Sequence, residues 1–147
     1  MKKILIYSDG ACSGNPGIGG WANAHKKSNG TKLANYGYTT ERVTNNAMEL
    51  KAALEAVKAV PHPRDIVIVT DSRYLITCWA HDEEWLMSKD RPNHELWVEF
   101  IHAVKNGKHT VSFEKVKGHS GDEMNSLVDR LARQQIKEAR HRLYEDS

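Results

Sequence analysis

Residues 3–9 read KILIYSD and residues 66–71 read IVIVTD, and these two stretches decide the fold. In each stretch a run of residues is apolar on both alternating faces, which is the pattern of a central strand covered on two sides. Each run then ends in a hydroxyl residue followed by an aspartate, Ser8-Asp9 in the first and Thr70-Asp71 in the second. The pattern predicts two buried strands, each with an aspartate near its carboxyl end.

Further patterns around these strands give the order β-β-β-α-β-α-α-β-α. Asn29-Gly30 lies between strand-compatible flanks and predicts a hairpin of the second and third strands within residues 20–39. Apolar residues at spacings of 3, 4 and 3 predict an amphipathic helix over 47–57, which Pro61 ends. The other expected elements are shorter helices between 72 and 106, an edge strand over 110–116 and a helix from Asp122 to about His141.

This order predicts an α/β fold built on a five-stranded mixed sheet with helices on both faces. Strands 1–3 are expected to be antiparallel, and a right-handed crossover places strand 4 parallel to strand 1, with strand 5 parallel as well. The chain has 147 residues, which is the size of one domain, so we expect a single domain over 1–147. Its last residues, about 142–147, are expected to form a disordered tail.

The composition is that of an ordinary globular protein, with 39% apolar and 27% charged residues. It argues against a disordered, collagen-like or disulfide-rich chain. The N-terminal apolar run is too short for a signal peptide or a membrane span, and Cys12 and Cys78 fit free thiols in a reducing compartment. We therefore expect a cytoplasmic protein. A net charge of +2 neither requires nor excludes a polyanionic partner.

Asp9 and Asp71 become side-by-side carboxylates if their strands are parallel neighbours, because such strands lie roughly 4.8 Å apart. Two ionised carboxylates about 5 Å apart repel by roughly 3 kcal/mol at an effective dielectric constant near 20. The pair therefore needs a cation or a shared proton. Mg²⁺ prefers carboxylate ligands and keeps positions open for water and phosphate oxygens.

Each candidate acidic residue also has an ordinary structural role. Asp71 could cap the helix that starts near Arg73, a role that Ser72 could share, and Asp9 could be a turn residue before a glycine. Glu49 could form a capping box with Asn46, three positions earlier. Asp129 could pair with Arg133 on a solvated helix face.

Two glycine-rich segments stand out beside these acidic residues. Residues 9–20 contain no Gly-Lys-Ser/Thr and precede a hairpin rather than a helix, so they are not a phosphate-binding loop of the nucleotide-binding type. A hairpin turn explains most of their glycines, which would also permit close approach by a ligand, with the Asn15 amide beside them. His119 lies between glycines, where an ordinary surface-loop role is also open.

Taken together, the chain resembles the type 1 ribonuclease H family over about Ile4 to Arg133. The resemblance depends on four segments in the correct order and spacing: Tyr7-Ser8-Asp9-Gly10 with Gly14-Asn15-Pro16-Gly17; Thr44-Asn45-Asn46-Ala47-Met48-Glu49-Leu50; Thr70-Asp71-Ser72; and Val116-Lys117-Gly118-His119-Ser120-Gly121 with Asn125 and Asp129. Capping and surface pairing do not predict this joint arrangement.

The resemblance implies a metal-dependent endonuclease that cleaves the RNA strand of an RNA·DNA hybrid and leaves 5′-phosphate and 3′-hydroxyl ends. It implies two Mg²⁺ ions, with Mn²⁺ as a substitute, held by Asp9, Glu49, Asp71 and Asp129. His119 matches the family histidine that assists proton transfer or product release. The residues placed along the hybrid are Gly10, Cys12, Asn15, Thr44, Asn45, Asn46 and Arg73. We expect a monomer that has no obligate protein partner and does not bind a membrane.

One segment departs from the family pattern. Well-studied bacterial relatives often carry a Lys/Arg-rich helix and loop here, whereas residues 79–97 contain five Asp or Glu and only two Lys or Arg. We therefore expect weak, salt-sensitive hybrid binding. Lys137, Arg140 and Arg142 could compensate in part, or could simply be a solvated helix end.

Three other functions remain open at this point. They are a non-catalytic nucleic-acid-binding module, a DNA-cutting nuclease on the same fold, and a protein-interaction domain whose carboxylates bind a structural ion.

Overall fold

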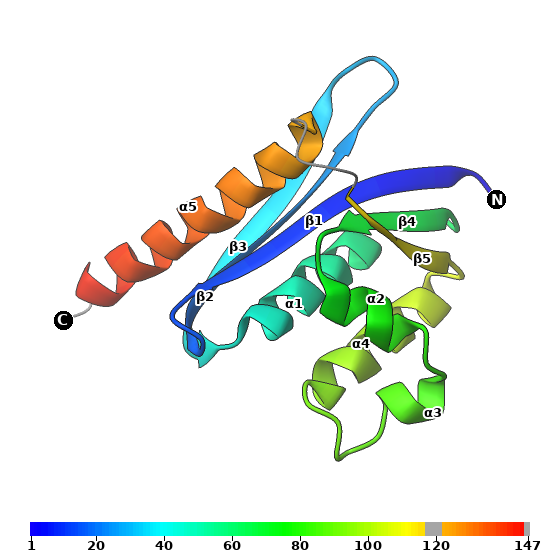
Figure 1. Ribbon diagram of the computed structural model, residues 1–147. Coiled ribbons are helices and arrows are strands. Elements are labelled where there is room, and N and C mark those ends of the chain that lie inside the picture. Colours follow the sequence, from blue (N-terminus) through cyan, green and yellow to red (C-terminus); the bar gives the residue numbers. More distant parts are fainter. Residues whose placement is uncertain (117–121, 146–147) are drawn as a thin grey trace.

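The computed structural model describes residues 1–116 and 122–145, and their elements are labelled in Figure 1. The strands are β1 (Lys3–Ser13), β2 (Gly17–Lys26), β3 (Lys32–Val43), β4 (Asp65–Thr70) and β5 (Thr110–Lys115). The helices are α1 (Asn45–Lys58), α2 (Arg73–Trp79), α3 (Glu83–Leu86), α4 (His94–Asn106) and α5 (Glu123–Glu145). The order is the expected one, except that three helices rather than two connect β4 to β5.

The five strands form one mixed sheet in the order β3-β2-β1-β4-β5, as predicted. β1 is antiparallel to β2, and β2 is antiparallel to β3. β4 is parallel to both β1 and β5. The two stretches that decide the fold are therefore adjacent central strands, and β5 is the predicted edge strand.

Helices cover both faces of this sheet, again as predicted. On one face Ile6 and Ile68 pack with residues of α1, α2 and α4, and Trp97 and Phe100 are the largest side chains that are fully buried there. On the other face α5 crosses β1, β2 and β3 (Figure 1), and its Val128 packs on small residues of β2. Each fully buried aliphatic or aromatic side chain contributes roughly 1.5–3 kcal/mol, so these two layers hold the sheet in place.

The hairpin expected at Asn29-Gly30 joins β2 to β3. The Gly30 N–H donates to the Lys27 carbonyl at 2.9 Å, and the Asn29 side chain accepts from the Thr31 N–H at 2.9 Å. Gly30 has φ +90°, a conformation that favours glycine. The local sequence therefore determines this turn.

Two element ends differ from expectation. α5 continues to Glu145, so residues 142–145 are helical and do not form the expected disordered tail. Its start is close to the expected one, because Asp122 caps the helix by accepting from the Met124 N–H at 2.9 Å. β1 extends to Ser13, well beyond the apolar run, because it continues to pair with β2 after its pairing with β4 has ended.

In the part of the chain that the structure describes, every helix is too short or too polar to cross a membrane.

Candidate active site

The pairing of β1 with β4 brings two of the predicted carboxylates, Asp9 and Asp71, to equivalent positions on neighbouring chain segments. Tyr7 is the last residue of β1 to pair with β4, and its partner is Val69. Asp9 and Asp71 each follow two residues after this pair. The prediction that they lie side by side is confirmed, but Asp9 lies inside β1, where it pairs with Ala22 of β2, and not at the end of a strand.

A glycine allows α1 to bring the third carboxylate to this pair. A Cβ atom at Gly10 would lie 2.3 Å from the Met48 carbonyl carbon and 2.4 Å from the Glu49 nitrogen. Only glycine therefore permits the first turns of α1 to approach β1 this closely. Gly10 thus permits close approach by a helix, while close approach of a ligand to the glycines of this segment stays a prediction.

Asp9, Glu49 and Asp71 form one cluster, which we call the carboxylate cluster. One oxygen from each side chain lies within 4.8 Å of the others. Glu49 is 9% exposed, Asp9 is partly buried and Asp71 is exposed. The cluster therefore opens to solvent on the Asp71 side and is closed by the protein on the Glu49 side.

The electrostatics of the cluster oppose full ionisation. Burial and the charge of Asp71 raise the pKa of Asp9 to about 7, although hydrogen bonds from Glu49 and from the Gly10 N–H act in the opposite direction. Burial, the charges of Asp9 and Asp71 and a hydrogen bond with Asp9 together raise the pKa of Glu49 to about 10, although a hydrogen bond from the Gly10 N–H acts in the opposite direction. Without a cation, Glu49 therefore keeps a proton at neutral pH and shares it with Asp9.

Asp129 stands apart from the carboxylate cluster. Its Oδ2 accepts from Arg133 Nη2 at 2.8 Å, which is the i,i+4 pair that the sequence left open. Its charge still raises the pKa of Asp9, so it lies on the same side of the molecule as the cluster. Among the described residues, the set of mutually close ligand atoms contains three of the four predicted carboxylates and leaves Asp129 out.

The structural alternatives for Asp71 and Glu49 are wrong. Ser72 caps α2 by accepting from the Leu75 N–H at 3.2 Å. Thr44 caps α1 by accepting from the Ala47 N–H at 3.1 Å, so Asn46 is not the cap of a capping box. Sequence rules could have found Thr44, since it is also a good capping residue, but they do not choose among three adjacent candidates.

Three of the predicted substrate contacts are joined by hydrogen bonds at the β1–β2 turn. The Asn45 N–H donates to the Asn15 side chain at 3.2 Å, and the Asn45 side chain accepts from the Cys12 N–H at 3.1 Å. The Cys12 thiol also lies 3.1 Å from the Asn45 oxygen. The turn and the start of α1 therefore form one polar surface, which also includes the exposed Thr44 and Asn46.

The remaining predicted residues differ in how the structure places them. Arg73 is exposed at the first position of α2, two residues after Asp71. Arg42, which no motif singled out, reaches the β1–β2 turn, with its guanidinium 3.5 Å from the Pro16 carbonyl. His119 lies outside the described residues.

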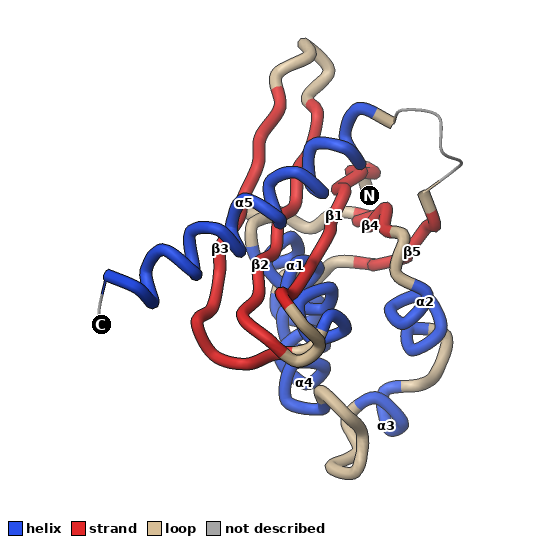
Figure 2. Tube along the Cα trace, turned by 60° about the vertical axis from the view of Figure 1, so that its left-hand side comes forward, coloured by secondary structure: helices blue, strands red, loops and turns tan. Residues whose placement is uncertain are grey.

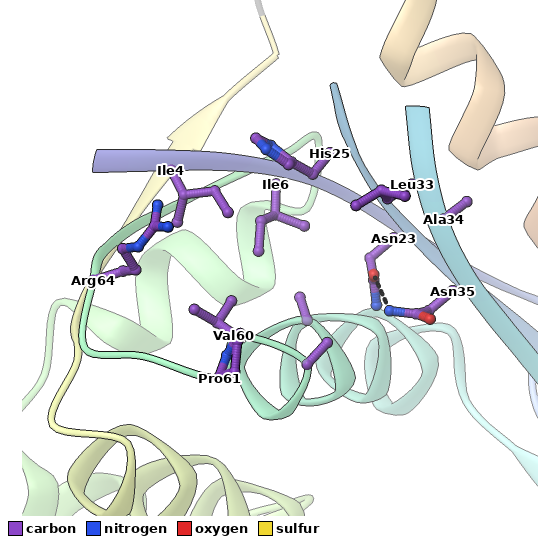
Figure 3. Close-up of a pocket in the computed structure, with 12 residues that line it drawn as sticks. Ile4, Ile6, Asn23, His25, Leu33, Ala34, Asn35, Val60, Pro61 and Arg64 are labelled. Atoms are coloured by element: carbon purple, nitrogen blue, oxygen red, sulfur yellow. Dashed lines mark hydrogen bonds between the residues drawn. The ribbon is translucent and has the colours of Figure 1, made fainter. Parts of the chain in front are cut away.

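An apolar pocket of about 420 Å³ between β1, β3 and the end of α1 is separate from the carboxylate cluster (Figure 3). Ile4, Val60 and Leu33 line it, and Asn35 donates to Asn23 across it at 3.4 Å. None of the three clustered carboxylates lines this pocket, so it does not belong to the candidate active site.

Comparisons with known proteins agree with this arrangement. The RNase H family model matches residues 1–137. A ribonuclease H of Caldicellulosiruptor saccharolyticus is 41% identical, with 95% of this chain and all of the relative covered. One from Caldanaerobacter subterraneus subsp. tengcongensis is 46% identical, with 91% of each chain covered.

Solved structures show the same fold. The crystal structure of LC11-RNase H1 in complex with an RNA/DNA hybrid has a TM-score of 0.72 and 22% identity, with 92% of this chain and 98% of that chain covered. The mixed sheet and its helices therefore place the chain among the α/β proteins with the RNase H fold. The chain belongs to the RNase H family, and its relatives are nucleases.

Proposed function

We propose that this protein is an endonuclease that hydrolyses the RNA strand of RNA·DNA hybrids with the help of two divalent cations, and that it leaves 5′-phosphate and 3′-hydroxyl ends. The observation that carries the proposal is the carboxylate cluster, in which Asp9, Glu49 and Asp71 converge from β1, α1 and the end of β4. Family membership supports the nuclease activity.

The carboxylate cluster fits a hard divalent cation. Three carboxylates whose oxygens lie within 4.8 Å repel one another, and burial together with this repulsion raises the pKa values of Asp9 and Glu49. Among the described residues, the buried Glu49 Oε2 has no hydrogen-bond partner, so a lone pair is available to a cation. Mg²⁺ binds such oxygens, and Mn²⁺ can replace it.

In our proposal Asp9, Glu49 and Asp71 hold the cations, and Asp129 contributes from α5. When bound, a pair of Mg²⁺ ions supplies an activated water and stabilises the negative charge that develops on the leaving oxygen. The chain itself fixes the carboxylates through β1, β4 and α1. The exposed side of Asp71 leaves the cluster open to a phosphodiester.

Substrate choice is assigned to the polar surface beside the cluster. Cys12, Asn15 and Asn45 are held in place by their mutual hydrogen bonds, and amides suit 2′-hydroxyls and base edges in a shallow minor groove. Gly10, Thr44, Asn46 and Arg73 are the further proposed contacts, with Thr44 directed to a phosphate of the DNA strand. His119 is proposed to assist proton transfer or product release.

The proposed enzyme needs only one copy of the chain. All the residues assigned here come from residues 9–129 of one chain, so we expect a monomeric enzyme whose partner is the hybrid. The single domain over 1–147 and the cytoplasmic location expected from the sequence stay predictions.

A cleavage assay with Asp71→Asn tests the proposal. Labelled RNA·DNA hybrid, duplex RNA, duplex DNA and single strands are incubated with and without Mg²⁺, and product ends are identified by their sensitivity to phosphatase. We expect metal-dependent cleavage of RNA in the hybrid alone, reduced by Asp71→Asn at least about 10³-fold. Asp90→Asn is the matched control, because Asp90 is exposed and outside the cluster.

Binding of the hybrid without cleavage would indicate a non-catalytic module, and cleavage of duplex DNA would indicate a DNA nuclease. Either result would overturn the proposal. A circular dichroism spectrum of Asp71→Asn that matches the wild type separates loss of chemistry from loss of fold.

A further inference from the structure

A groove lies between the edge strand β3 and the C-terminal half of α5, away from the carboxylate cluster. It has a volume of about 530 Å³ and is lined by Tyr36 and Tyr38 of β3 and by α5 side chains that include Gln134, Lys137 and Glu138. In Figure 2, α5 crosses β3 and its C-terminal end extends past the sheet. We call this groove the β3–α5 groove.

Two tyrosines stand exposed on one wall of the groove. Tyr36 is 55% exposed and Tyr38 is 42% exposed. They pair with Ala22 and Gly20 of β2, which lie against α5, so the helix packs beside the two rings. Residues two apart on a strand are about 6.7 Å apart, roughly two stacking intervals of 3.4 Å, so each ring has room for a base of its own.

The α5 wall of the groove carries one cation, Lys137, beside one anion, Glu138, and Arg140 follows one turn further along the helix. Residues 130–145 of α5 contain five Lys or Arg and two Glu, and one of these cations, Arg133, is paired with Asp129. Lys137 and Arg140 are exposed, and among the described residues neither forms an ion pair. Exposed, unpaired cations beside aromatic rings are suited to a nucleic-acid backbone.

A hydrogen bond connects the same helix, α5, to the proposed substrate surface. Arg140 Nη2 donates to Ser13 Oγ at 2.9 Å, and Ser13 begins the turn that carries Asn15. Ser13 lies four residues after Asp9 on β1, which is about 13 Å along a strand. The groove is therefore too far from the carboxylate cluster to contact the phosphate that is cut. A strand bound at the cluster could still continue along β1 to the groove.

We propose that the β3–α5 groove binds single-stranded nucleic acid. Bases stack on Tyr36 and Tyr38, phosphates lie against Lys137 and Arg140, and the side chains of Gln134 and Glu138 accept hydrogen bonds from base amino groups. A single strand is required, because the ring faces can be covered only by bases that are not stacked within a duplex. We take this single strand to be an unpaired extension of the hybrid, and this one point rests on the proposed function.

Binding without cleavage tests this proposal directly. Anisotropy of a labelled oligodeoxyadenylate, whose bases carry an amino group, is measured with Asp71→Asn as the parent. Adding either Tyr36→Ala or Tyr38→Ala should weaken binding about 5- to 150-fold, as expected for the loss of one stacked base. Adding Tyr36→Phe and Tyr38→Phe should leave binding close to that of the parent, because the rings remain.

The charge on the other wall is tested by salt titration. Lys137→Ala should weaken binding and lower the dependence of log K on log salt concentration by about 0.7, the value for one phosphate of a single strand. The matched controls are Leu33→Ala, which removes an exposed side chain from the opposite face of β3, and Lys27→Ala, which removes a charge from the β2–β3 hairpin. Neither control should change binding.

The proposal is overturned if the parent does not bind the oligonucleotide, or if the controls weaken binding as much as the groove variants do. Concentration-dependent dimerisation that the tyrosine variants abolish would also overturn it, since a second copy would then occupy the groove. Cleavage of a blunt hybrid by the wild type is measured in parallel. Failure there would contradict the proposed function and leave the oligonucleotide result standing.

Discussion

Glu49 is buried beside two other carboxyl groups, and this placement makes the folded chain sensitive to pH. Burial and neighbouring charge raise the pKa values of Glu49 and Asp9 above their ordinary values. At any pH between the pKa of such a group in the unfolded chain and its pKa in the folded chain, the folded chain binds more protons than the unfolded chain. Stability from these groups is therefore fully present below about pH 4 and is lost as the pH rises through 7 and beyond.

In a chelating buffer, the free energy of unfolding should fall by a few kcal/mol between about pH 5 and about pH 8.5, since each unit of pKa shift corresponds to roughly 1.4 kcal/mol. Urea unfolding at the two pH values measures the change. Addition of Mg²⁺ should recover stability mainly at the higher pH, because the cation competes with protons for the same oxygens.

Glu49→Gln is the control for this pH dependence, because it removes a titrating group and keeps a side chain of similar size. We expect a flatter stability profile for this variant. An equal pH dependence in the variant and the wild type would mean that other groups are responsible.

The individual carboxylates differ in how far the sequence could predict their positions. Asp9 and Asp71 follow apolar runs of adjacent parallel strands, so strand pairing alone predicts that they meet. The position of Glu49 depends on how closely α1 approaches β1, which is a tertiary contact that spacing along the chain does not contain. Asp129 keeps its local partner Arg133, an arrangement that the i,i+4 spacing had offered.

At the scale of elements, α1 and β1 approach each other so closely at Gly10 that no side chain fits there. Gly10→Ala would bring a Cβ within 2.3 Å of the Met48 backbone, and backbone atoms cannot give way as a flexible side chain can. We expect a loss of about 1–3 kcal/mol of stability, a displaced α1 and a large loss of nuclease activity. Thermal melting and the cleavage assay measure these effects.

Gly30→Asn is the matched control for Gly10→Ala. Gly30 lies at the β2–β3 turn, its added Cβ would have no atom within 4 Å among the described residues, and asparagine tolerates its positive φ. The positive φ of residue 30 should cost this variant about 1 kcal/mol of stability, and its activity should be unchanged because its new side chain meets no neighbour. A Gly10→Ala protein as stable and active as the control would contradict the close approach of α1 to β1.

Element types could be predicted from the sequence, whereas several element ends could not. Apolar periodicity predicts α1 and β4 because their buried faces are regular. It ends β1 too early, since residues after Tyr7 pair with β2 through backbone groups and need no apolar pattern. It also ends α5 too early, because the last turns of that helix carry mainly polar residues.

At the scale of the whole molecule, the segment of residues 79–97 lacks the charge that would attract a nucleic acid. Within it Glu83 pairs with Lys105 at 2.8 Å, and Arg91, one of its two cations, stacks on Trp85 with its guanidinium carbon 3.4 Å from the ring. Few cations therefore remain there for phosphates.

Insertion of a Lys/Arg-rich helix between α3 and α4 should lower KM for the hybrid at least about tenfold at moderate salt, with kcat within about twofold, because phosphate neutralisation strengthens binding and leaves the carboxylates unchanged. Steady-state kinetics over a range of salt concentrations measure both constants. An insertion of the same length made of Gly and Ser controls for the longer loop. Unchanged KM at low and moderate salt would contradict the electrostatic account.

The central position of β1 also affects the order in which the protein assembles during translation. Its neighbour β2 emerges from the ribosome directly after it, but its other neighbour, β4, begins only at Asp65. At roughly 5–20 residues per second, synthesis leaves one side of β1 unpaired for roughly 3–12 s. During that interval the nascent chain exposes an open strand edge to other molecules, and Asp9 has no Asp71 beside it, so the carboxylate cluster cannot form before β4 has been made.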